Sequence, residues 1–515
     1  MSPLLPHRRA SRTANPTSSP LFVAKNEKIA ERTCQVIDSK GTPTKTTHRE
    51  HHVSTPLYPL RSPFRPGFYA FRTQKPRYII LNLGNVAPVR RRPNNLPPMR
   101  KLLLFTLAAT RLLLAQPGPA PLPTDPLPKE WIDPDTGHRV IRLSREDGTA
   151  SLYFHQNAYS ADGKKLVVTN PHGIATINLE TRAIEQVVEG RVNILVTGHK
   201  TGRIYYTRDG AIFATDLDTK KTTEIAKMPP QAGPRGAVAV NADETLLVGI
   251  APDPDGKVIP RTPPANGGGG SLEANWAAGT PKMLYTIEIA TGKFRKIYTE
   301  NDWTNHLQMS PTDPNLIMFC HEGPWHYNDR VWTIRTDGTG LKLMHERTQN
   351  MEIAGHEFFS ADGKTVWYDL QTPKSTVFWV AGVDLATGHR TWYNLQRPEW
   401  SVHYNVSADG KLFAGDGGGP DSVAARTPDG EKIPGNGQWI YLFRPSMVKG
   451  SSFRDKKDLI DIGYFKSEKL VNLSKHNYHL EPNVTFSPDM KWIVFRSNML
   501  GPTHVFAVEI AKAVK

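Results

Sequence analysis

Cysteine and long hydrophobic runs are scarce in this 515-residue chain. It contains two cysteines, Cys34 and Cys320, which fall in parts of the chain with very different composition. An internal disulfide is therefore excluded in the main body of the chain, which must be stabilised by a hydrophobic core. The longest hydrophobic run, LLLFTLAATRLLLAQ at residues 102–116, is too short to cross a bilayer as a helix.

Sequence signatures of two common enzyme classes are also absent. The chain has no G-x-S-x-G motif, which argues against a serine hydrolase attached to the main domain. The glycine run 417–419 ends a predicted strand and is followed by no helical pattern. A phosphate-binding loop is therefore not expected there.

The positive charge of the chain is confined to its first part. The formal net charge is +15, and residues 1–98 contribute 13 of it with 17 Lys and Arg against 4 Asp and Glu. The remaining chain is close to neutral, so its composition does not indicate a nucleic-acid-binding surface.

The N-terminal 130 residues do not resemble a folded domain. Residues 1–98 are rich in Pro, Arg, Thr and Ser and lack periodicity, which predicts a disordered or mis-called upstream extension. Residues 99–115 then combine a methionine, two cations, a short apolar run and Ala115, as a secretory signal peptide does. A Pro-rich linker follows at 116–130. We expect translation to begin at Met99 and the mature protein to be periplasmic or secreted, without stable membrane insertion after signal cleavage.

From Trp131 onward one unit recurs with a period of about forty-five residues. Each unit has two turn signatures separated by β-branched and aromatic runs that suit buried strands. The first turn reads SADGK (160–164), HKTGR (199–203), NADET (241–245), SPTDPN (310–315), SADGK (360–364), SADGK (407–411) and SPDMK (487–491). The second reads NLETRA (178–183), DLDTKK (216–221), EIATGK (288–293), RTDGTG (335–340) and DLATGH (384–389). The pattern predicts an all-β domain over 131–515, a seven-bladed β-propeller with four strands in each blade.

Two segments interrupt the repeat, and one segment is expected to close it. Residues 252–280 and 417–469 are predicted loops that project from one face. The segment GHRVIRLS at 137–144 resembles the last strand of a unit. We expect it to complete the final blade beside the C-terminal strand, which removes an exposed edge.

Three histidines occupy the same place in three consecutive repeats. His306, His356 and His403 each lie four residues before the serine of the first turn, in the predicted innermost strand. Because side chains alternate along a strand, these rings are predicted to share one face directed at the axis. The same parity selects, in other repeats, Gln156, Arg235, His479, Glu481 and Asn483. Such a polar set is costly to bury without a function, and imidazole with carboxylate suits Mn, Zn, Fe or Ni.

The CHEGPW stretch after His306 leaves two interpretations open. Cys320 ends an apolar strand and is interpreted as a buried packing residue. His321 and Glu322 either line the site or cap the turn.

Several of these motifs resemble the oligogalacturonate lyases of the seven-bladed propeller type. The resemblance rests on WTNHLQMSPTDPNLIMFCHEGP (303–324), GHEFFSADGKTVWY (355–368), VHYNVSADGKLFAGDG (402–417) and DPDTGHRVIRLS (133–144), and extends over about residues 131–512. It implies β-elimination in short pectin fragments, helped by a divalent metal, usually Mn²⁺. It also implies that His306 is the general base and that His356 binds the metal.

The remaining site residues are less directly matched to the family pattern. Aligning on Pro482 implies His476, His479 and Glu481 as further metal ligands, whereas counting back from the turn gives Glu481 and Asn483. Where the family has an arginine in the third blade, this chain has Lys282, so Lys282 or Arg235 is expected to assist catalysis. Arg330 matches a family arginine and, with His321 and His403, is assigned to substrate binding.

The predicted function is a metal-dependent lyase acting on an acidic oligosaccharide. Removing the C5 proton of a uronate requires a neutralised carboxylate and a base near neutral pKa, which suits histidine. Two alternatives remain open: a non-catalytic TolB-like periplasmic propeller that serves as a binding module, and a lyase for a different uronic-acid glycoside. The sequence does not indicate an oligomeric state.

Overall fold

The computed structural model describes residues 127–513 except for 231–236, 264–269, 434–437 and 451–458. The predicted extension (1–98), the signal peptide (99–115) and most of the linker (116–130) lie outside the described residues, so the predictions about them stay predictions. Within the described part, none of the helices has the length and hydrophobicity needed to cross a membrane.

The chain is an all-β protein, which confirms the predicted class. Among the described residues, four sheets have four strands each. The first two comprise β3 (Ala150–Ser151), β4 (Lys165–Asn170), β5 (Gly173–Asn178) and β6 (Ile184–Glu189), then β7 (Asn193–Thr197), β8 (Arg203–Arg208), β9 (Ala211–Asp216) and β10 (Thr222–Lys227). The next two comprise β11 (Ala237–Val240), β12 (Leu246–Pro252), β13 (Lys282–Glu288) and β14 (Phe294–Glu300), then β15 (Trp303–Met309), β16 (Leu316–Glu322), β17 (Val331–Arg335) and β18 (Lys342–Leu343).

The last two sheets are larger, with eight and five strands. The eight-stranded sheet contains β19 (Ile353–Phe359), β20 (Thr365–Gln371), β21 (Phe378–Asp384), β22 (Arg390–Leu395), β26 (Asp461–Asn472), β25 (Trp439–Met447), β24 (Phe413–Gly415) and β23 (Tyr404–Val406) in spatial order. The five-stranded sheet contains β1 (Glu130–Ile132), β2 (His138–Arg142), β29 (His504–Lys512), β28 (Trp492–Ser497) and β27 (Thr485–Phe486). The helices are short: α1 (Ser271–Ala278) and the 3₁₀ turns η2 (Trp325–Tyr327), η3 (Arg397–Glu399) and η4 (Val423–Ala425).

The repeated turns form because their own side chains hold the backbone. In the turn after β19, Ser360 Oγ donates to Asp362 and accepts from the N–H of Thr365, while Asp362 accepts from Lys364 N–H. The same three bonds recur in the turns that begin at residues 160, 407 and 487. Gly363 has φ +68°, a conformation that favours glycine. Local chemistry therefore fixes each hairpin independently of distant contacts.

The eight-stranded sheet differs from the separate four-stranded blades that the repeat predicts. β22 and β26 pair in parallel, which joins two four-stranded groups into one sheet. The predicted loop 417–469 also proves to contain β25 and the first part of β26, two strands paired along most of their length. Because β26 has 12 residues, it can pair with β25 along its length and with β22 at its first half.

The N-terminal strand lies beside the C-terminal one. β2 pairs antiparallel with β29, and β1 extends the sheet on the other side of β2. The segment 137–144 therefore pairs with the strand that its sequence predicts as a neighbour.

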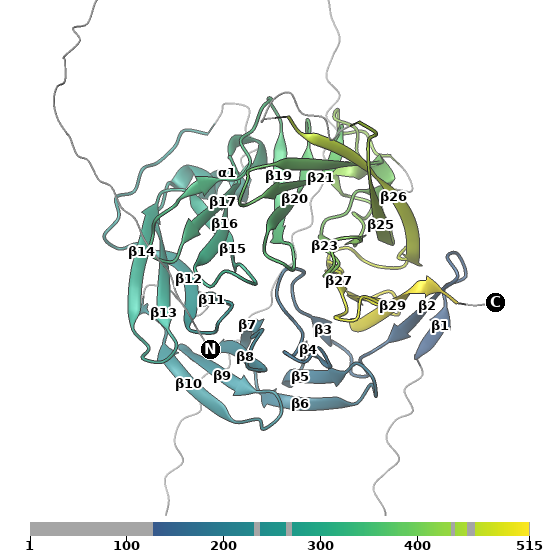
Figure 1. The fold of residues 1–515 in the computed structure, drawn as a ribbon, viewed down its shortest axis with the longest axis horizontal. Helices are drawn as coiled ribbons and strands as arrows, with labels where there is room; N and C mark the ends of the chain where they lie inside the picture. Colours follow the sequence, from purple (N-terminus) through teal and green to yellow (C-terminus); the bar gives the residue numbers. More distant parts are fainter. Residues whose placement is uncertain (1–126, 231–236, 264–269, 434–437, 451–458, 514–515) are drawn as a thin grey trace, which may run out of the picture. The chain divides into compact units, whose positions relative to one another are not determined.

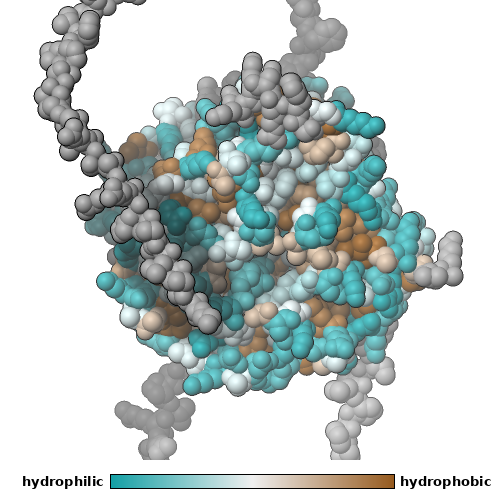
Figure 2. Space-filling view, viewed as in Figure 1, coloured by the Kyte–Doolittle hydropathy of each residue, from teal (hydrophilic) through white to brown (hydrophobic). Residues whose placement is uncertain are grey.

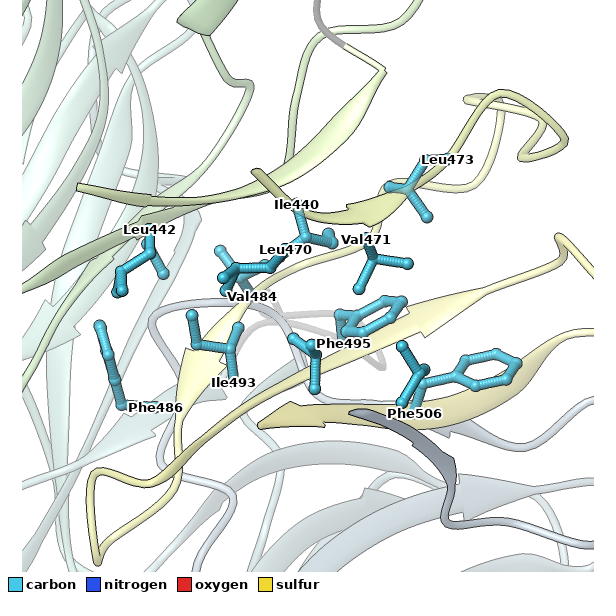
Figure 3. Packing of buried hydrophobic residues seen from close by; sticks show 13 residues of the cluster. Ile440, Leu442, Leu470, Val471, Leu473, Val484, Phe486, Ile493, Phe495 and Phe506 are labelled. Atoms are coloured by element: carbon cyan, nitrogen blue, oxygen red, sulfur yellow. The ribbon is translucent and has the colours of Figure 1, made fainter. Parts of the chain in front are cut away.

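The sheets follow one another around a common centre, with β7, β11, β15 and β27 nearer the middle and β6, β10 and β14 at the periphery (Figure 1). Hydrophobic side chains fill the space between neighbouring sheets. Figure 3 shows one such layer, in which Leu442 and Leu470 of the eight-stranded sheet face Ile493 and Phe506 of the five-stranded sheet. On the face seen in Figure 2, hydrophobic side chains form separate patches among hydrophilic ones. Packing of the sheets thus leaves the inner strands free to carry polar residues.

Candidate active site

A β-bulge presents each of the first two axial histidines. The pairing of β15 with β16 shifts register between Asn305 and Gln308, and that of β19 with β20 shifts between Gly355 and Phe358. His306 and His356 lie in these bulges with φ of +47° and +45°. Side chains at positive φ are uncommon outside glycine and are often found at functional sites. The regular alternation of side chains along the strand, from which the directions of His306 and His356 were predicted, is therefore interrupted at these two residues.

His306 lies against a buried ion-pair cluster. Arg330 donates from Nε to Glu357 Oε2 at 3.0 Å and from Nη1 to Glu322 Oε1 at 2.9 Å. His306 Nδ1 is 3.3 Å from Glu357 Oε1 and 3.3 Å from Arg330 Nη2. His306 Nδ1 therefore faces both Arg330 Nη2, which can only donate, and Glu357 Oε1, which can only accept and has no aligned donor among the described residues, so the tautomer of His306 decides which contact becomes a hydrogen bond.

The carboxyl groups of this cluster are held in the charged form. Burial acts to raise the pKa of Glu357, but the charge of Arg330 and the contact with His306 outweigh it and lower the pKa well below its usual range. Burial likewise opposes ionisation of Glu322, and Arg330 with Trp325 lowers its pKa. Two carboxylates and one guanidinium thus surround the His306 ring.

His356 and His403 are each oriented by a carboxylate from the neighbouring strand. His356 Nδ1 is 3.0 Å from Asp369 Oδ1, and His403 Nδ1 is 2.7 Å from Asp416 Oδ2. A carboxylate at Nδ1 fixes the ring and leaves Nε2 to act as an acceptor or metal ligand. The ring centroids of His356 and His403 are 4.8 Å apart, and those of His306 and His356 are 6.2 Å apart. The three predicted histidines therefore come together.

Both carboxylates act to raise the pKa of their histidine, but the net pKa shifts of His356 and His403 have opposite signs. Burial lowers the pKa of His356, but the hydrogen bond and charge of Asp369 outweigh it and raise the pKa. Burial lowers the pKa of His403 and outweighs Asp416, so this ring is neutral. His403 Nδ1 donates its hydrogen to Asp416 in a hydrogen bond, so the unprotonated Nε2 accepts a hydrogen bond from the Tyr153 hydroxyl at 3.1 Å.

The loop between β3 and β4 brings three aromatic side chains to the histidines. Tyr153 and Phe154 lie against His403 with ring centroids at 5.1 and 4.6 Å, and His155 lies 6.2 Å from His306. Burial and the neighbouring His306 lower the pKa of His155 to about 3, so His155 is neutral. Residues of this loop, including Phe154 and His155, also line a cavity of ≈ 230 Å³ together with inner strands and their turns.

Trp325 forms a wall of the site on the other side of His356. Its indole nitrogen donates to Glu322 Oε1 at 2.7 Å, and its ring lies 6.3 Å from the ring of His356. Behind it, Trp276 of α1 donates to Asn328 at 2.8 Å. The predicted insertion 252–280 thus braces the segment that carries Trp325.

The residues assigned to the last repeat are only partly brought to this cluster. Glu481 Oε2 is 3.8 Å from His403 Nε2 and its side chain is 45% exposed. His479 is exposed. His476 is buried, with Nδ1 2.9 Å from Ser497 Oγ and Nε2 2.6 Å from Leu480 O. Asn483 has φ +56°, like His306 and His356, but its amide bonds to Phe154 N–H and Glu481 O. Asn483 therefore shapes the backbone.

The other predicted residues lie around or outside the cluster. Cys320 is buried and unpaired, and burial raises its thiol pKa, in keeping with a packing residue. His321 Nε2 bonds to Glu300 at 3.0 Å. Glu300, Asp302 and His321 form a group of possible metal-binding side chains, as His306, Cys320 and Glu357 do. Lys282 begins β13 opposite Glu300, and no hydrogen bond or ion pair links it to the histidines within the described residues.

Two predicted residues have other outcomes. Gln156 bonds to Leu195 O and Tyr153 N, a backbone-supporting role that differs from the predicted axial one. Arg235 lies outside the described residues.

Sequence reasoning missed the carboxylates that support the histidines, although the spacing contained a signal. Asp369 and Asp416 each follow their histidine by 13 residues. That recurrence places both at the same point of the second strand. Glu357 directly follows His356 in the GHEF motif, and no repeated spacing points to Tyr153.

The sequence is similar to those of known proteins of one family. The family model described as oligogalacturonate lyase matches residues 129–514. An oligogalacturonate lyase of Dickeya dadantii is 26% identical over 395 residues, covering 75% of this chain and 96% of the relative. An oligogalacturonide lyase of Pectobacterium atrosepticum is 25% identical with the same coverage.

Solved structures share the fold. An oligogalacturonate lyase in complex with manganese superposes with TM-score 0.59 at 22% identity, covering 74% of this chain and 96% of that one. The oligogalacturonate lyase of Vibrio parahaemolyticus gives the same TM-score and identity, covering 75% and 97%. The chain thus belongs to the oligogalacturonate lyase family and is a lyase-type enzyme.

Proposed function

We propose that this protein is a metal-dependent uronate lyase that cleaves oligogalacturonates, short pectin fragments, by β-elimination to 4,5-unsaturated products. The observation that carries the proposal is the group of three histidines, each backed by a buried carboxylate, at the meeting point of the inner strands. Family membership supports the same substrate class.

The proposed architecture is a seven-bladed propeller closed by the N-terminal strand. Dividing the eight-stranded sheet at the β22–β26 pair gives two four-stranded blades, and β27, β28, β29 and β2 form another. Together with the four separate sheets this makes seven. The first strands of successive sheets adjoin, as β7 does β11 and β11 does β15, which supports a ring.

Imidazole and carboxylate groups suit a divalent ion, and Mn²⁺ is the proposed one. Among the described residues, the groups whose ligand atoms already lie within 4.8 Å of one another are His306 with Cys320 and Glu357, and Glu300 with Asp302 and His321, so the ligands proposed below would have to move together to hold the ion. His356 Nδ1 is hydrogen-bonded to Asp369, so Nε2 is the ring nitrogen that can bind the metal. Glu481 is half-exposed next to His403, and the exposed His479 lies two residues away on the same segment. We assign the ion to His356, His479 and Glu481. His476 fits less well, because both of its ring nitrogens are hydrogen-bonded.

His306 is the proposed base. A bound divalent ion would neutralise the uronate carboxylate and so make the C5 proton more acidic. His306 takes that proton, the C5–H electron pair forms the C4–C5 double bond, and O4 leaves with the C4–O4 pair and gains a proton. Glu357 accepts from Nδ1 and stabilises the imidazolium, which leaves Nε2 as the base. The His306 side chain is 18% exposed, so substrate can reach it.

The location that we propose is the periplasm or the cell exterior, reached through the signal sequence at 99–115.

The experiment for the function is a panel of uronic-acid oligomers incubated with and without chelator. We expect unsaturated products from oligogalacturonate that disappear with chelator and return with Mn²⁺. Cleavage of another uronate polymer in place of oligogalacturonate would assign a different substrate, and binding without cleavage would favour a binding module.

A further inference from the structure

Arg496 occupies, in the last repeat, the position that the histidine-supporting carboxylates occupy in theirs. Asp369 and Asp416 come nine residues after the turn serines Ser360 and Ser407, and Arg496 comes nine after Ser487. Asn483, thirteen residues before Arg496, has the positive φ of the bulged histidines. The repeat therefore aims Arg496 at the same central region, with the opposite charge.

Backbone carbonyls, and no carboxylate, hold the Arg496 guanidinium. Its Nε donates to Glu481 O at 2.8 Å and its Nη1 to Ser151 O at 3.3 Å. Among the described residues it forms no ion pair within 4.0 Å, and its Nη2 has no hydrogen-bond acceptor. Both of these backbone contacts lead into the site, because Ser151 is two residues from Tyr153 and Glu481 itself faces His403.

The electrostatic surroundings show that this cation is only partly compensated. Burial lowers the pKa of Arg496, and the charges of Glu481 and Asp416 act against that effect from a distance. Arg330, the other arginine of the site, forms ion pairs with both Glu322 and Glu357. Its positive charge is therefore already compensated by two carboxylates. A half-buried guanidinium without an anion is energetically costly unless an anion arrives.

We propose that Arg496 binds a carboxylate of the uronate substrate. This inference rests on the proposed function. It assigns the cation that binds the substrate carboxylate to Arg496, and not to Lys282 or Arg330, which the sequence suggested for this region. A guanidinium edge matches a planar carboxylate in a way that an ammonium group does not. The two backbone carbonyls fix the plane of the guanidinium before substrate arrives, and Nη2 remains available to donate.

The test measures binding of trigalacturonate, and of the same trisaccharide with its carboxyl groups reduced to alcohols, by titration calorimetry. Both ligands are titrated into the full chain carrying His306→Ala, which blocks turnover, with and without Arg496→Gln. Gln can still donate to one of the backbone carbonyls, and Arg496→Lys keeps the charge. Arg335→Gln, which removes an exposed arginine paired with Asp313, is the control for loss of a positive charge elsewhere.

We expect Arg496→Gln to weaken trigalacturonate binding about 10-fold to 100-fold, the effect of losing a charge-assisted hydrogen bond. The affinity for the neutral trisaccharide should stay unchanged. The affinity of Arg496→Lys for trigalacturonate should lie between those of the proteins with Arg496 and with Gln at this position. Equal weakening of both ligands would assign Arg496 a purely structural role and overturn the inference, as would no weakening of either. If the variants retaining Arg496 bind no uronate at all, the proposed function fails together with the inference. If wild type cleaves oligogalacturonate and Arg496→Gln binds it normally, the inference alone fails.

Discussion

Replacing Glu357 with Gln separates the two tasks that the structure gives this carboxylate. The amide keeps the size of the side chain but removes the negative charge between Arg330 and His306. Breaking a buried ion pair costs about 3–5 kcal/mol, and we expect about 3 kcal/mol here because Glu322 still pairs with Arg330 at 2.9 Å. His306 also loses the anion that stabilises its imidazolium, so kcat should fall by roughly 100-fold to 10,000-fold.

The assay combines urea unfolding with the rate of unsaturated-product formation. The matched control is Glu352→Gln, which breaks another buried carboxylate–histidine pair, Glu352 with His345 at 2.7 Å. This control should lose a comparable amount of stability and keep its kcat. If Glu357→Gln loses stability but keeps kcat within about threefold of wild type, Glu357 has no part in orienting the base. If its stability is unchanged, the ion pair with Arg330 is refuted.

Three further predictions concern the rest of the site and the core. Asp416→Asn should raise KM by about 10-fold, because an amide at Nδ1 no longer fixes the tautomer of His403, which is assigned to substrate binding; an unchanged KM would contradict the role of this pair. His306→Ala should abolish product formation while metal content, measured by elemental analysis, stays at the wild-type level, and loss of the metal would make His306 a ligand. Burial raises the pKa of Glu352, but its bonds from His345 and Thr348 outweigh this and lower it. The stability it contributes is therefore full above the ordinary carboxyl pKa and is lost as pH falls toward the lowered value. The stability gap between wild type and Glu352→Gln should thus narrow in acid urea titrations; a constant gap would refute the shift.

The turns were predictable because their information is local. Ser360, Asp362 and Gly363 form their bonds within a few residues, so the sequence indicates the hairpin without knowledge of the fold. The offset of His306, His356 and His403 from these turns was predictable for the same reason. The three rings do lie together, as the repeat implied.

Features that depend on pairing between strands were not predictable in this way. The bulges at His306 and His356 arise from a register shift against β16 and β20, which alternation along one strand cannot reveal. Tyr153 reaches His403 from a segment 250 residues earlier, a contact that depends on how distant strands are arranged. The parallel β22–β26 pair likewise depends on strand lengths that the turn pattern does not encode.

The last repeat illustrates both cases. The motif around Pro482 indicated Glu481, which does face His403. It gave no sign that His476 uses both ring nitrogens in hydrogen bonds, since Ser497 comes from the next strand. Arg496 could have been found from spacing alone, because it shares its position with Asp369 and Asp416.

The central claim is that the three histidines serve an elimination reaction. Its most direct test is mass spectrometry of the products formed from trigalacturonate in water labelled with heavy oxygen, with Mn²⁺ present. Elimination predicts an unsaturated fragment and no incorporation of the label through bond cleavage. Saturated fragments that carry the label at the cleaved bond would show hydrolysis and contradict the account.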